Sequence, residues 1–111
     1  MHELALTQSV VDQISELLPD ARVTRVELEI GNLSGVVCDS VRLCFEICTQ
    51  GTLLEAARLE IIETPGRAIC RSCRAHFEVA DLFTACRCGS AETDLISGQE
   101  LKIRSVEIAD V

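Results

Sequence analysis

The sequence predicts an α+β fold: a small three-stranded sheet with two helices packed on it, interrupted by an inserted segment that carries four cysteines. Two observations predict it. Apolar residues recur at helical spacing in two stretches and alternate with polar residues in three others. Between the last two alternating stretches this periodicity fails, and the four cysteines lie there. We therefore predict one α/β domain from residues 1–66 and 98–111 and an inserted domain from residues 67–97.

The first two predicted elements are a helix and a strand. Residues 4–18 read LALTQSVVDQISELL, in which Leu4, Val11 and Ile14 fall at helical spacing. This pattern is typical of an amphipathic helix, and the Pro-Asp pair that follows ends it. Residues 22–30 read RVTRVELEI, so apolar and charged side chains alternate, which predicts a half-buried strand.

A second helix is predicted from Asp39 or Ser40, either of which can cap it, to about Gln50, and Gly51 supplies the stop. Its inner face carries two of the three cysteines that lie outside the inserted segment. Free cysteine commonly packs as a small hydrophobe. We therefore expect Cys44 and Cys48 to be buried thiols, and we expect no metal ligand among Cys38, Cys44 and Cys48.

The remaining strands of the sheet are predicted on either side of the insertion. Residues 58–63 read RLEIIE and residues 100–108 read ELKIRSVEI, and both alternate. Because these two strands flank the insertion, we expect them to pair with each other. The inserted segment would then project like the tip of a long hairpin.

Composition limits the possible partners. The net charge of −8 and the absence of Trp and Tyr argue against nucleic acid, because binding to it depends on basic and aromatic side chains. We recognise no signal segment, and no apolar run approaches the roughly 20 residues needed to cross a bilayer. We therefore expect a cytoplasmic location and no membrane contact. In that reducing compartment seven cysteines favour metal ligation or buried thiols over disulfides.

The inserted segment has the spacing of a tetrahedral metal site. Cys70 and Cys73 form a CxxC pair, and Cys86 and Cys88 form a CxC pair further along. Two such pairs can place four thiolates around one Zn²⁺, which predicts a zinc-ribbon-like domain. The short second pair leaves room for His76 to compete for the fourth position. A closed shell has no open position for water, so we expect structural zinc and no enzymatic activity.

The N-terminus offers a second kind of metal site. The amine of Met1, the deprotonated amide of His2 and the His2 imidazole can close successive chelate rings around one ion. Such an in-plane nitrogen arrangement suits Ni(II) or Cu(II). Glu3, through its amide or its carboxylate, would complete the square. If the amine is not a ligand, the site must be redrawn around His2 and more distant residues such as Asp39.

Several segments together resemble the HypA/HybF family of hydrogenase maturation nickel metallochaperones. They are the opening MHELALTQSVV, the turn GNLSGV, the FE of the second helix, the CxxC and CxCGS motifs, and LKIRSVEI. The resemblance covers essentially the whole chain. It implies a nickel site at Met1, His2 and Glu3, a four-cysteine zinc domain, and nickel insertion into the large subunit of nickel-iron hydrogenase with a HypB-type GTPase. In some organisms similar proteins also serve urease.

Two departures from the family pattern are the CxC pair, where many members have CxxC, and Cys38, where a proline is usual. The leading hypothesis is a nickel metallochaperone with zinc as a structural ion and nickel as cargo, either a monomer or a weak homodimer. The alternatives are a zinc-ribbon module for protein interaction and a redox protein with a four-sulfur iron site of rubredoxin type.

Overall fold

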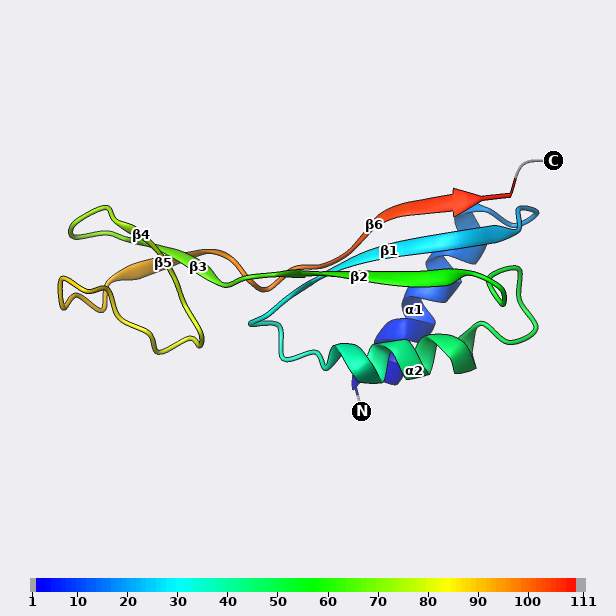
Figure 1. Cartoon of the computed structure of the whole chain (residues 1–111), viewed down its shortest axis with the longest axis horizontal. Coiled ribbons are helices and arrows are strands. Elements are labelled where there is room, and N and C mark those ends of the chain that lie inside the picture. Colours follow the sequence, from blue (N-terminus) through cyan, green and yellow to red (C-terminus); the bar gives the residue numbers. More distant parts are fainter. Residues whose placement is uncertain (1, 110–111) are drawn as a thin grey trace.

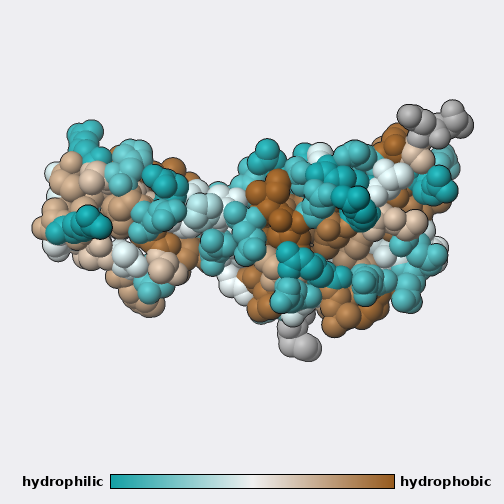
Figure 2. All heavy atoms as spheres, viewed as in Figure 1, coloured by the Kyte–Doolittle hydropathy of each residue, from teal (hydrophilic) through white to brown (hydrophobic). Residues whose placement is uncertain are grey.

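The computed structural model describes residues 2–109 as an elongated α+β molecule of 56 × 28 × 18 Å, as predicted. Figure 1 shows a larger body with both helices joined to a smaller one by a narrow connection, and the space-filling view in Figure 2 shows the same waist. The larger body contains α1 (His2–Leu17), β1 (Val23–Gly31), α2 (Cys38–Cys48), β2 (Arg58–Thr64) and β6 (Leu101–Ile108). The smaller body contains β3 (Arg67–Cys70), β4 (His76–Glu78) and β5 (Thr93–Ser97).

The core of the larger body lies on one face of its sheet. Val26, Leu28 and Ile30 of β1 are fully buried, which confirms the predicted alternation. They pack in one cluster with Ile14 of α1 and Phe45 of α2, among other buried residues. Both helices therefore cover the same face of the sheet. In the described residues, no helix is both long and apolar enough to cross a membrane.

The strand order corrects one prediction. The sheet runs β2-β1-β6, with β2 parallel and β6 antiparallel to β1, so the two strands that flank the insertion do not pair. The most buried strand, β1, takes the centre, where both its edges are satisfied. The helix α2 supplies the crossover that a parallel β1–β2 pair requires. At the end of β1, Gly31 N–H donates to Glu100, just before β6, and Asn32 N–H donates to Thr64, at the end of β2. The end of β1 therefore lies between the two segments that connect the larger body to the smaller one.

Both helix starts differ from prediction. The first helix begins at His2, two residues earlier than expected, so His2 and Glu3 belong to the helix. The second begins at Cys38, and Val37 precedes it without a side-chain cap. Asp39 therefore does not cap the helix; its Oδ1 accepts from Arg42 at 2.7 Å.

The inserted segment contains three strands where the sequence shows no periodicity. They form a second sheet in the order β4-β3-β5. These strands are three to five residues long, too short for an alternation to show. The small core holds Ala68, Val79 and two of the cysteines, whereas Phe83 is 93% exposed and Leu82 is 63% exposed.

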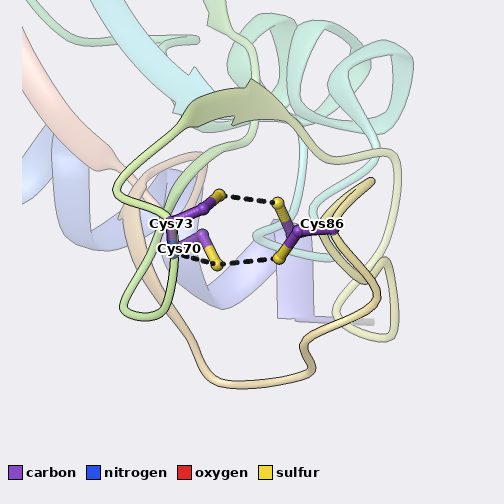
Figure 3. A group of neighbouring side chains, drawn as sticks. Cys70, Cys73 and Cys86 are labelled. Atoms are coloured by element: carbon purple, nitrogen blue, oxygen red, sulfur yellow. Dashed lines mark hydrogen bonds between the residues drawn. The ribbon is translucent and has the colours of Figure 1, made fainter.

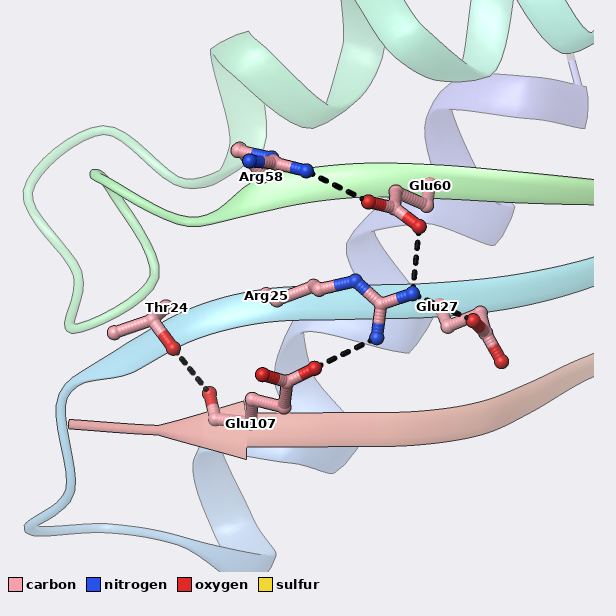
Figure 4. A network of polar contacts seen from close by, with 6 residues as sticks. All are labelled: Thr24, Arg25, Glu27, Arg58, Glu60 and Glu107. Atoms are coloured by element: carbon pink, nitrogen blue, oxygen red, sulfur yellow. Dashed lines mark hydrogen bonds and ion pairs between the residues drawn. The ribbon is translucent and has the colours of Figure 1, made fainter. Parts of the chain in front are cut away.

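A charge network ties the three strands of the larger body together on the face away from the helices (Figure 4). The guanidinium of Arg25 on β1 contacts one carboxylate on each strand, those of Glu27, Glu60 and Glu107, at 2.6–2.7 Å. Arg25 and then Arg58 hold the pKa of Glu60 at about 2. The outer face of the sheet is therefore charged, and its charges form ion pairs that connect neighbouring strands.

Close backbone packing joins the two bodies. A Cβ added to Gly31 would lie 2.1 Å from Gly98, and one added to Gly66 would lie 2.6 Å from the side chain of Leu33. Leu33 N–H also donates to the carbonyl of Gly98 at 2.6 Å. The connection between the bodies is thus a packed crossing at which only glycine fits.

Candidate metal centres

The sulfur atoms of the four cysteines of the inserted segment lie close together (Figure 3). The Sγ atoms of Cys70 and Cys88 are 3.6 Å apart, and those of Cys73 and Cys86 are 3.5 Å apart. All four lie within 4.8 Å of one another. Sulfurs at the corners of a tetrahedron, each about 2.3 Å from a zinc ion, are about 3.8 Å apart. The cluster therefore fits one zinc ion with little adjustment.

Two similar turns position the sulfurs. In the first, Cys70 N–H donates to the carbonyl of Ala75 and Arg74 N–H donates back to that of Cys70, each at 2.9 Å. In the second, Cys86 N–H donates to Ser90 at 3.2 Å and Gly89 N–H donates back to Cys86 at 2.9 Å. The CxC turn makes the same two bonds, but each bond spans one residue fewer than its counterpart in the CxxC turn. The missing residue therefore shortens the turn and leaves its closure intact.

In each turn, the residue directly after the second cysteine adopts the left-handed backbone conformation. Gly89 has φ 92° and Arg74 has φ 65°, in the region where a side chain is strained. A glycine is an ordinary sequence signal for such a turn, whereas nothing in the sequence marks Arg74. A hydroxyl contact of 3.0 Å between Ser72 and Ser90 also links the two turns.

The backbone around the first turn favours a thiolate. Cys73 N–H points at the sulfur of Cys70 at 3.5 Å, and this donor, with that of Ser72, lowers the pKa of the Cys70 thiol to about 6. Hydrogen bonds of this kind stabilise sulfur in its metal-binding charge state. Within residues 2–109 the cluster consists of cysteines alone, and His76 lies exposed on β4 outside it.

The other three cysteines lie apart from this cluster, at the start, middle and end of α2. Cys48 is buried, while Cys38 and Cys44 are half-buried. Burial raises the pKa of the Cys38 and Cys48 thiols. These two thiols are therefore neutral at physiological pH. Cys48 packs as a buried hydrophobe, as the sequence predicts, whereas Cys44 is only half-buried.

The predicted nickel motif lies at the start of α1, although Met1 is outside the described residues. His2 is exposed, and it lines a cavity of about 340 Å³ together with Glu3, Leu33 and Leu101, among others. Glu3 is only 9% exposed, and its Oε2 accepts the backbone N–H of Val37 at 3.2 Å. This bond fastens the beginning of α1 to the beginning of α2. No sequence signal marks Val37 for that role.

Asp39, the more distant nickel ligand considered from the sequence, lies elsewhere. Its side chain is 93% exposed and paired with Arg42. It borders a different cavity, which Cys38 and Glu63 also line. The structure therefore brings His2 and Glu3 together and does not bring Asp39 into their cavity.

Comparisons with known proteins agree with this arrangement. A family model described as hydrogenase/urease nickel incorporation, metallochaperone, hypA matches residues 1–108. The chain belongs to this family. A relative in Trichormus variabilis, named hydrogenase maturation factor HypA, is 50% identical over 111 residues, which are 100% of this chain and 98% of the relative. A relative of the same name in Geobacter metallireducens is 47% identical over 109 residues, 97% and 99% of the two chains.

A solved structure supports the fold of this HypA-family chain. The nickel metallochaperone HypA of Helicobacter pylori superposes with a TM-score of 0.66 at 22% identity, covering 96% of each chain. Family membership identifies the chain as a nickel metallochaperone of hydrogenase maturation, which confirms the leading hypothesis over the interaction module and the iron protein. Nickel is its cargo, and the four-cysteine cluster fits zinc as the structural ion.

Proposed function

We propose that the chain binds nickel through Met1, His2 and Glu3 and releases it to the hydrogenase machinery. One observation carries the proposal: His2 is exposed at the very start of a helix. The first N–H groups of a helix have no acceptor within it, so the amide nitrogen of His2 can lose its proton to a metal without breaking a helical hydrogen bond. The imidazole of the same residue then adds a donor in the same plane.

We further propose that Glu3 contributes its amide nitrogen and not its carboxylate. The carboxylate already accepts the N–H of Val37, and Glu3 is almost fully buried. Turning it toward a nickel ion would compete with this contact between the two helices. A set of nitrogen donors that includes two deprotonated amides also binds nickel more weakly as pH falls, because protons compete for the same atoms.

We propose that Cys70, Cys73, Cys86 and Cys88 bind one structural zinc, and that residues 67–97 fold as a unit around it. The apolar core of this segment is small, and zinc supplies the missing stability: structural sites contribute on the order of 10 kcal/mol or more. Residues 1–66 and 98–111 then form the nickel-binding domain. That domain has its own core and depends less on zinc.

We propose a cytoplasmic protein that transfers cargo and catalyses no reaction. Its partners would be a HypB-type GTPase and the large subunit of nickel-iron hydrogenase. None of the seven cysteines is paired in a disulfide, which suits a reducing compartment. Metal transfer requires an ion that a partner can reach, and the exposed His2 meets this requirement better than a closed four-sulfur shell.

Nickel titration of two histidine variants tests the proposal. The chain has two histidines, so His76→Ala is a matched control for His2→Ala. We expect calorimetry to show nickel affinity largely lost in His2→Ala and unchanged in His76→Ala, with zinc content equal in both. A short extension before Met1 should also abolish binding, because it converts the amine to an amide, whereas the same extension at the C-terminus should not. Native affinity in the N-terminally extended protein would refute the amine as a ligand.

A further inference from the structure

The helix α2 exposes apolar side chains on the surface that faces away from the sheet. Its residues Val41, Phe45 and Cys48 are buried against the core. Leu43 and Ile47 lie one helical turn apart on the opposite face, and they are 60% and 54% exposed. Figure 2 shows hydrophobic surface at the place where Figure 1 draws α2. Within residues 2–109, this face of the helix is therefore largely uncovered.

The helix α1 adds to the same face along the line where the two helices meet. The backbone N–H of Val37, just before α2, donates to Glu3 at the start of α1. At the other end of α2, burial and nearby charges that include the carboxylate of Asp12 on α1 raise the pKa of Cys48. The helices therefore begin together and stay close to the end of α2. Leu4, which is 51% exposed, lies two turns before Asp12 on the same side of α1.

The charge of the larger body is concentrated on these helices. The helix α1 has three acidic residues and neither lysine nor arginine. On the outer face of the sheet, by contrast, the basic side chains pair with glutamates: Arg25, Arg58, Lys102 and Arg104. Residues 67–97 contain as many basic as acidic side chains. The helices and the turns that join them to the sheet therefore carry most of the net charge of −8.

Acidic side chains border the apolar face on both sides. On α1, Asp12 and Glu16 are one turn apart and exposed, and on α2, Asp39 and Glu46 are two turns apart and exposed. A second copy of this chain would set like charges against each other along both borders, and an anionic lipid surface would also be repelled. An amphipathic helix with apolar residues on one face and lysine or arginine beside them complements both features.

We propose that Leu4, Leu43 and Ile47, with their acidic borders, dock a basic amphipathic helix of a protein partner. The apolar side chains of the partner cover these three residues, and its basic side chains reach the carboxylates on either side. Apolar anchors at helical spacing supply affinity in such a complex, and the flanking charges fix the orientation. The cavity at His2 lies on the side of α1 that carries Leu6, away from Leu4, so docking does not require nickel.

A designed peptide tests the proposal on the zinc-loaded chain. The probe is an amphipathic helix of about five turns with leucines on one face and lysines on the other. The control peptide has the same composition in an order that spreads the leucines around the helix. We expect the probe to bind one to one and more weakly as salt rises, and the control to bind about tenfold more weakly or less. The amide NMR signals that shift on binding should be those of α1 and α2, not those of β6 or residues 67–97.

Exposed residues allow matched variants of the chain. Leu43→Ser removes an apolar anchor without changing the charge and should weaken binding of the probe about tenfold. Glu46→Lys reverses a border charge and should weaken binding about threefold, most clearly at low salt. Leu17→Ser is the apolar control, because Leu17 is 78% exposed on the side of α1 toward β6, one turn beyond Gln13, which lines the groove there. Glu92→Lys makes the same charge change in the smaller body.

Both control variants should keep the native affinity, and far-ultraviolet circular dichroism should show every variant folded. Absence of saturable binding at low salt overturns the proposal, and so does equal binding of the two peptides. Equal losses in Leu43→Ser and Leu17→Ser, or signal shifts confined to β6 or the smaller body, also overturn it. If sedimentation shows a dimer that Leu43→Ser dissociates, the occupant is a second copy and the proposal is wrong.

Discussion

The zinc turns allow a quantitative prediction for Gly89→Ala. Gly89 has φ 92°, and a Cβ added there would meet no atom within 4 Å. The cost of the substitution therefore comes from the backbone alone, about 1–2 kcal/mol for a left-handed residue with a side chain. If this cost falls on the folded, zinc-bound turn, zinc affinity should drop about 5- to 30-fold. The expected effect is large enough to measure and too small to abolish the site.

Competition for zinc against a chromophoric chelator measures this change. Gly51→Ala is the matched control, because Gly51 has φ 77° and the same open surroundings but lies after α2 in the other body. It should lower the thermal midpoint of the larger body and leave zinc affinity unchanged. Arg74→Gly removes the same kind of strain from the first turn, so its zinc affinity should equal or exceed that of the native chain. An unchanged affinity in Gly89→Ala would refute the role of the turn.

Three further predictions concern stability. Leu28→Ala should lower the free energy of unfolding by about 2–5 kcal/mol in denaturant titrations, because Leu28 is fully buried at the centre of the core. Removing zinc with a chelator should reduce the chemical-shift dispersion of the amide NMR signals of residues 67–97, while the signals of α1 and β1 stay dispersed. Loss of dispersion in both sets would show that the two bodies do not fold separately. The pKa of Glu60 is about 2, below its ordinary 4.5, so the Arg25 network should stabilise the fold above pH 4.5 and lose this contribution as pH falls toward 2. Glu60→Gln should flatten that part of the curve of unfolding free energy against pH.

The elements with strong periodicity were predictable from sequence, and so was the cysteine cluster. The alternation in VELEI predicts which side chains of β1 are buried. The spacing of the two cysteine pairs predicts that their four sulfurs lie together. Local pattern was enough for these features because each depends on neighbours in the chain.

Features that depend on distant partners were not predictable. The strand order depends on which strand the helices bury most deeply, and no local pattern in β2 or β6 records it. The capping prediction for α2 failed because Asp39 finds Arg42 as its partner, and the bond from Val37 to Glu3 spans 34 positions. The three short strands of the smaller body are held by pairing and by the metal turns, so side-chain alternation does not mark them.

X-ray absorption at the nickel and zinc edges of one doubly loaded sample tests the central claim most directly, since it reports each metal's donors separately. The account predicts zinc surrounded by four sulfurs at about 2.3 Å. It predicts nickel in a planar shell of nitrogen donors that includes an imidazole, with no sulfur. Sulfur scattering at the nickel edge, or an imidazole at the zinc edge, would contradict the assignment of Met1, His2 and Glu3 to nickel and of the four cysteines to zinc.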